Sequence, residues 1–149
     1  MLGKTLFWAM KKKISPNPID PQRSALMARV RQRHSAPEQA VRQILRSLEI
    51  PYKLHRKSLP GTPDIVVPSR KCVVFVHGCF WHRHASCSKA TMPKSRVSFW
   101  TDKFEKNVAR DRRNNRAIRK RGWKVVTVWE CQCKHPERLS KRLSRYLNP

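Results

Sequence analysis

The sequence predicts an α/β fold, in which a mixed central sheet has helices packed on its faces. Residues 64–67 and 72–77 are short apolar segments typical of two neighbouring buried strands. Residues 123–129 alternate apolar and polar side chains, as expected for a third strand. Stretches with helical spacing precede, separate and follow these strands. Apart from a short first helix, the resulting order is helix, strand, strand, helix, strand, helix.

Two helices are expected before the first strand. A short basic helix is predicted over residues 24–33. In the next, Ser35 and Glu38 have the spacing of a capping box. The apolar stripe that follows consists of Val41, Ile44, Leu45 and Leu48. This helix is expected to end near Pro51.

Two further helices are marked by their boundaries. A long basic helix is predicted from about residue 97 to residue 121, where Gly122 provides the stop. A last helix begins at Pro136 and turns Leu139, Leu143 and Leu147 inward.

The length of 149 residues allows one modest core. We expect residues 1–20 to form a disordered basic arm and residues 21–149 to form a single domain. Lys and Arg number 34 against 9 acidic residues, for a formal net charge of +25. Such an excess indicates a polyanionic partner, foremost nucleic acid, rather than a merely solvated surface.

No apolar run reaches the ~20 residues of a membrane span, so a soluble protein without a membrane partner is expected. The five cysteines are an odd number, lie among histidines and follow no export signal. These features favour metal binding over disulfides.

The loop over residues 78–95 contains a candidate metal site. Cys79, His84 and Cys87 lie within nine residues and offer three ligands to a tetrahedral ion. Spacing alone leaves Cys131 and Cys133 open as the fourth ligand. Four protein ligands would make the site structural. The alternative is a set of unrelated loop thiols and exposed histidines.

Polar residues at two strand ends suggest hydrolysis of a phosphodiester. Asp64 can hold Mg²⁺ through a hard oxygen, while His77 and His82 can exchange protons or contact phosphate. Each residue also has an ordinary explanation. Asp64 can start a strand, His77 can cap one, and Glu38 can serve only its capping box.

The run His77-Gly78-Cys79-Phe80-Trp81-His82 resembles the very short patch repair (Vsr) endonuclease family. Residues 59–64, 99–100, 107–112 and 128–131 extend the resemblance, in the family's order, over roughly residues 21–134. It implies a variant of the restriction-endonuclease-like PD-(D/E)XK fold. The reaction implied is a Mg²⁺-dependent nick in one strand of double-stranded DNA, 5′ to the thymine of a T·G mismatch left by 5-methylcytosine deamination.

The resemblance also implies residue roles. Asp64 would bind Mg²⁺ together with the backbone carbonyl of Val76, and His82 would be the general base. His77 and Glu38 would support catalysis. Structural Zn²⁺ is implied on Cys79, His84, Cys87 and Cys131. A wedge into the base stack is implied for Phe80, Trp81, Trp100 and Met27, although Trp100 could instead serve core packing.

Two rival functions are compatible with the same sequence. One is a related nuclease with another DNA target, and the other is a non-catalytic, zinc-stabilised nucleic-acid-binding protein. For the repair endonuclease we expect a monomer in the bacterial cytoplasm, associated with the nucleoid, with mismatch-repair proteins as candidate partners.

Overall fold

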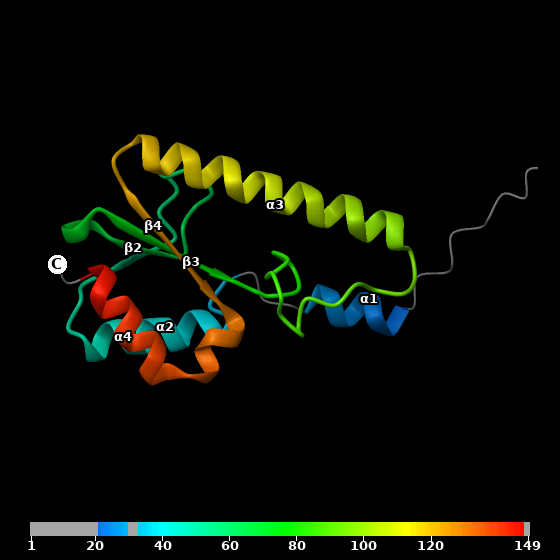
Figure 1. The fold of residues 1–149 in the computed structure, drawn as a ribbon, viewed down its shortest axis with the longest axis horizontal. Helices are drawn as coiled ribbons and strands as arrows, with labels where there is room; N and C mark the ends of the chain where they lie inside the picture. Colours follow the sequence, from blue (N-terminus) through cyan, green and yellow to red (C-terminus); the bar gives the residue numbers. More distant parts are fainter. Residues whose placement is uncertain (1–20, 30–32, 148–149) are drawn as a thin grey trace, which may run out of the picture.

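The computed structural model describes residues 21–29 and 33–147 (Figure 1). The arm expected over residues 1–20 lies outside the described residues. In the part of the chain that is described, four strands form one sheet in the order β1-β2-β3-β4. The strands are β1 (Lys53–Leu54), β2 (Ile65–Val67), β3 (Cys72–His77) and β4 (Lys124–Trp129).

The sheet is mixed, as expected. β1 pairs with β2, and β2 with β3, in antiparallel orientation, whereas β3 and β4 are parallel. The register sets Ile65 opposite Val74, so the start of β2 lies beside the middle of β3, and β3 continues beyond it to His77. Asp64, just before β2, and His77 therefore lie toward the same end of the sheet.

Alternation along the strands divides the core between the two faces of the sheet. On one face, α2 (Ala36–Ser47) and α4 (Pro136–Leu147) pack against Ile65, Val67 and Val74. On the other face, Val66, Val73 and Phe75 pack against Ile118 of α3 (Val97–Lys120). Figure 1 shows α3 on one side of the sheet and the other two helices opposite. A fold of two helical layers around a sheet results.

The helix boundaries follow from local chemistry. Ser35 Oγ accepts a hydrogen bond from the Glu38 N–H, which begins α2. The capping box is only half formed, because the Glu38 carboxylate accepts from the His34 N–H instead of that of Ser35. Gly122 lies beyond the end of α3 with φ +79°, a conformation that costs glycine little. Leu139, Leu143 and Leu147 are buried, as predicted.

Three expectations about secondary structure need correction. The first helix, α1, spans Pro21–Ala28 rather than residues 24–33. Strand β1 was not expected, because two residues are too few to show a period. Short 3₁₀ helices follow β2 at Pro68–Arg70 and β4 at Glu130–Lys134. Among the described helices, none is long and apolar enough to cross a membrane.

Candidate active site and metal cluster

A cavity of about 400 Å³ lies between the sheet and α3. His77 continues the series Val73 and Phe75, so its side chain is on the α3 face of β3, and Asp64 is on the same face of the sheet by alternation from Val66. The cavity is lined by both residues together with His82 and Val76. Helix α3 contributes Arg110, Asp111, Asn114 and Asn115. Three of the residues predicted for catalysis therefore share one cavity.

His77 and His82 lie face to face in this cavity. Their rings are stacked with centroids 3.8 Å apart and planes 8° apart. His82 Nδ1 is 2.6 Å from Asp111 Oδ2 on α3. An Nδ1–H that donates to a carboxylate leaves Nε2 as the nitrogen with the free lone pair. The geometry is that of a histidine oriented for proton transfer.

The pKa values of two cavity residues, His77 and Asp111, indicate which of them is neutral and which is charged. Burial, followed by the positive charge of His82, lowers the pKa of His77 to about 4, so His77 is neutral at pH 7. It can therefore donate a hydrogen bond as a neutral imidazole. Burial opposes ionisation of Asp111, but its hydrogen bond and charge interaction with His82 outweigh this and lower its pKa. Asp111 is thus held as a carboxylate beside His82.

Asp64 has an environment that suits a cation ligand. Its Oδ2 accepts a hydrogen bond of 2.7 Å from the Val76 N–H, which fixes the carboxylate against β3. Burial and the nearby charge of Glu38 raise its pKa, although the Val76 hydrogen bond opposes the rise. A divalent cation next to Asp64 would favour the ionised form.

Glu38 lies outside the residues that line the cavity. Its side chain is 2% exposed at the start of α2, where it accepts a 2.8 Å hydrogen bond from the His34 N–H. Its carboxylate also contacts Arg42 and lies 3.1 Å from His55 Nε2. Its influence on Asp64 is electrostatic in this structure.

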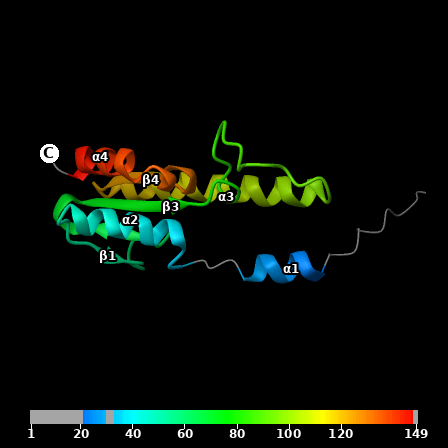
Figure 2. The same cartoon turned by 90° about the horizontal axis from the view of Figure 1, so that it is seen from below.

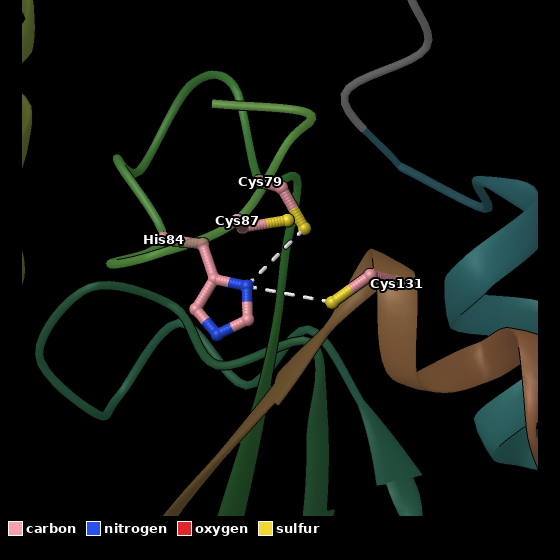
Figure 3. Close-up of side chains that lie close together, drawn as sticks. All are labelled: Cys79, His84, Cys87 and Cys131. Atoms are coloured by element: carbon pink, nitrogen blue, oxygen red, sulfur yellow. Dashed lines mark hydrogen bonds between the residues drawn. The ribbon is translucent and has the colours of Figure 1, made fainter. Parts of the chain in front are cut away.

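The four predicted zinc ligands are brought together (Figure 3). Their ligand atoms all lie within 4.8 Å of one another. His84 Nδ1 is 3.7 Å from Cys79 Sγ and 3.4 Å from Cys131 Sγ. Tetrahedral zinc with ordinary bond lengths separates such a nitrogen and sulfur by roughly 3.6 Å. The donor set therefore fits a closed, four-coordinate Zn²⁺ site.

The cysteines outside this cluster are placed differently. Cys133 Sγ lies 3.7 Å from the Pro37 carbonyl and 3.8 Å from that of Trp129. Burial raises the pKa of Cys72 to about 11, which makes it an inert core thiol. All five cysteines are free. Within the cluster, backbone hydrogen bonds, chiefly from Lys89, lower the pKa of Cys87, whereas burial raises that of Cys79.

Trp129 connects the metal cluster with the catalytic cavity. One face of its indole stacks on His84, with centroids 4.3 Å apart and planes 11° apart. Its ring also makes a T-shaped contact with His77 at 5.4 Å. Ring contacts thus run from His84, a candidate metal ligand, through Trp129 and His77 to His82.

The aromatic residues predicted to wedge into DNA form a cluster over the first half of α3. The ring centroid of Phe80 lies 5.1 Å from that of Trp81 and 5.6 Å from that of Trp100. The centroids of Trp81 and Trp100 are 6.1 Å apart. Both Phe80 and Trp81 are half-buried, and both pack against Trp100. Met27 is half-buried on α1, which Figure 2 shows set apart from the sheet.

Two residues of this site were not identified from the sequence. Asp111 was noted only within a stretch that resembles the family's long helix, because it is one of three acidic residues scattered along a basic helix and belongs to no motif. Trp129 was noted only as a strand residue and within residues 128–131, which extend the family resemblance. Both residues could be recognised only by their position relative to β3. Asp111 lies where α3 passes the end of β3, and Trp129 lies at the end of β4 beside it, so the order of the strands must be known first.

Comparison with known sequences gives a family. The sequence profile described as DNA mismatch endonuclease Vsr matches residues 19–89. The type II nicking enzyme V.XorIIP of Xanthomonas oryzae pv. oryzae is 46% identical over 94% of this chain and 99% of its own length. The DNA mismatch endonuclease Vsr of Escherichia coli is 40% identical over 79% of this chain and 75% of its own length.

Comparison with solved structures concerns the fold. The catalytic domain of the homing endonuclease I-Bth0305I has a TM-score of 0.54 and 20% sequence identity, and the match covers 75% of this chain and 93% of that domain. The similarity confirms a mixed α/β fold of the kind found in an endonuclease domain. The sequence comparisons agree with the resemblance carried by residues 77–82: the chain belongs to the Vsr family of DNA mismatch endonucleases.

Proposed function

We propose that this protein is a Mg²⁺-dependent endonuclease that nicks one DNA strand 5′ to the thymine of a T·G mismatch. The observation that carries the proposal is the convergence of Asp64 and the His82–Asp111 pair on one cavity. A non-catalytic binding protein has no need for an oriented histidine beside a half-buried carboxylate. Membership of an endonuclease family supports the same conclusion.

In the proposed reaction His82 is the general base. Asp111 holds the Nδ1–H of His82, so Nε2 takes the proton from the attacking water. The developing imidazolium is stabilised by the Asp111 carboxylate. His77, neutral at pH 7, donates a hydrogen bond to a phosphate oxygen and keeps the His82 ring in place by stacking.

Asp64 and the carbonyl of Val76 are the proposed Mg²⁺ ligands, with Glu38 in support through its charge beside Asp64. The cation supplies neutralisation of the charge that develops on the phosphate. The Val76 N–H holds the Asp64 carboxylate toward the cavity before any substrate binds. The four-ligand cluster of Cys79, His84, Cys87 and Cys131 would hold structural Zn²⁺ and fix the loop that bears His82.

DNA contacts follow from the charge and the aromatic cluster. Phosphates would be bound by the basic arm of residues 1–20 and by exposed basic residues of α3, among them Lys106, Arg113 and Arg116. Phe80, Trp81 and Trp100 would enter the stack at the mispair, where unstacking costs least, and Met27 would enter from the opposite groove. We further propose a monomer of one domain, residues 21–149, in the bacterial cytoplasm near the nucleoid, with mismatch-repair proteins as partners.

The substitution His82→Ala tests the assignment of the general base. It should lower kcat for nicking a T·G duplex by about 10²-fold or more, the range for loss of a proton-transfer group. Single-turnover nicking and DNA binding by fluorescence anisotropy measure the two effects separately. Nicking within a factor of two of the wild-type protein would assign the proton transfer to another residue.

Asp111→Asn tests the orientation of His82. The amide is a weaker acceptor and can favour the wrong imidazole tautomer, so kcat should fall by roughly 10–100-fold, as is typical when a partner that orients a functional histidine is lost. Asp102→Asn is the matched control, because Asp102 is an exposed residue of the same helix that pairs with Lys106. An equal loss in both variants would indicate a general effect on α3 rather than on His82.

A further inference from the structure

A second group of metal-ligand side chains lies at the start of α2, outside the catalytic cavity. His34 precedes the helix cap, Glu38 follows in its first turn, and His55 comes directly after β1. The ligand atoms of the three residues all lie within 4.8 Å of one another. Two imidazoles and one carboxylate are the donor set of sites for borderline divalent cations such as Zn²⁺, Co²⁺ or Ni²⁺.

The geometry at His55 favours a cation that is shared with Glu38 over a direct hydrogen bond between the two side chains. Its Nε2 is 3.1 Å from Glu38 Oε1, a separation close to the roughly 3.0–3.4 Å between neighbouring ligands on one cation. This nitrogen is nevertheless buried without a hydrogen-bond partner among the described residues. Buried polar atoms almost always have a hydrogen-bond partner, and an exception needs an explanation such as a bound ion. A cation between His55 and Glu38 would provide one.

Arg42 shows that the cluster already attracts positive charge. Its Nη2 contacts Glu38 Oε1 and lies 2.7 Å from His34 Nδ1, so one guanidinium nitrogen bridges two of the three ligands. The Nε of the same side chain is buried without a partner. Besides Glu38, the carboxylate of Asp64 adds negative charge nearby. A metal ion would have to replace the Arg42 guanidinium rather than enter an open space.

We propose that His34, Glu38 and His55 form a second divalent-metal site, which a borderline transition-metal ion occupies in exchange for the Arg42 guanidinium. The site differs from the cysteine cluster in having no thiolate. It differs from the proposed Mg²⁺ site in its imidazole ligands, which favour softer cations. Occupancy would engage Glu38, so the same cations are expected to slow nicking, a consequence that rests on the proposed function.

Titration of the full-length, zinc-loaded protein with Co²⁺ tests the site directly. We expect one further equivalent to bind, with d–d absorption bands and without the intense thiolate charge-transfer bands of cobalt in a cysteine site. His34→Gln should weaken binding by more than the roughly 10–100-fold that loss of an outer-shell partner costs. Arg42→Gln should tighten it about tenfold, or ~1.4 kcal/mol, by removing the competing cation.

His135→Gln is the matched control, since His135 is an exposed histidine outside the cluster, and it should bind Co²⁺ as the wild-type protein does. The proposal fails if neither the wild-type protein nor Arg42→Gln develops the bands, or if His34→Gln binds with unchanged affinity. His34 is exposed, so this variant remains informative even where His55→Gln does not fold. Binding is measured without DNA and nicking without Co²⁺, so a failure of either proposal is recognised independently of the other.

Discussion

Asp64→Ala is expected to reduce nicking of a T·G duplex by at least roughly 10³-fold, because a metal-binding carboxylate provides several kcal/mol of transition-state stabilisation. DNA binding should remain, since the proposed phosphate contacts are made by basic side chains of residues 1–20 and of α3 rather than by Asp64. The measurement pairs single-turnover nicking in Mg²⁺ with an anisotropy titration of the same duplex.

The variant Asp64→Asn separates charge from structure. Its amide oxygen can still accept the hydrogen bond from the Val76 N–H, so the local fold is preserved, whereas the negative charge is lost. We therefore expect Asp64→Asn to be as inactive as Asp64→Ala. The matched control is Asp102→Ala, which removes an exposed carboxylate from α3 and should nick normally. Activity of Asp64→Asn near that of the wild-type protein would exclude a role of this carboxylate as a cation ligand.

Cys79→Ala is expected to impair both folding and cleavage, because it removes a buried ligand of the proposed zinc site. A structural zinc site contributes an apparent ~10–16 kcal/mol, comparable to the ~5–15 kcal/mol stability of a whole domain. Partial loss of that contribution should lower Tm by roughly 10 °C or more. Thermal unfolding and zinc content by atomic emission measure the effect, and a strong chelator should reproduce it in the wild-type protein.

Cys133→Ala is the control for the cluster. Cys133 is half-buried near Cys131, but its thiol contacts backbone carbonyls and is not part of the metal cluster. This variant should keep its zinc and its activity. If Cys133→Ala lost zinc while Cys131→Ala retained it, the assignment of the fourth ligand would be wrong. His82→Ala gives the contrasting pattern, with normal zinc content and Tm but impaired cleavage.

Local patterns in the sequence predicted those parts of the fold that depend on near neighbours. The leucine spacing of α4, the apolar strands β2 and β3 and the Gly122 stop each reflect interactions within a few residues. Strand β1 was missed because two residues form a strand only through pairing with β2. The boundaries of α1 were displaced for a related reason, since a short basic segment has only a weak apolar stripe.

The site shows the same division between local and long-range information. Cys79, His84 and Cys87 could be proposed from spacing, but the choice between Cys131 and Cys133 needed the family resemblance and agrees with the cluster geometry. The pairing of His82 with Asp111 joins residues 29 positions apart, across the crossover from β3 to β4. No local pattern reports which turn of α3 passes over the end of β3. Alternation along β3 accounts for the orientation of His77 once that crossover is known.

Mismatch-specific cleavage is measured by strand-specific nicking of a duplex with one T·G mismatch in Mg²⁺, beside the matched T·A and C·G duplexes and an EDTA control. We expect a single nick 5′ to the mispaired thymine, no cut in the complementary strand, and no product with EDTA or with either matched duplex. Equal cleavage of matched and mismatched duplexes would point to a nuclease with another target. Tight DNA binding without any Mg²⁺-dependent product would contradict the catalytic assignment altogether.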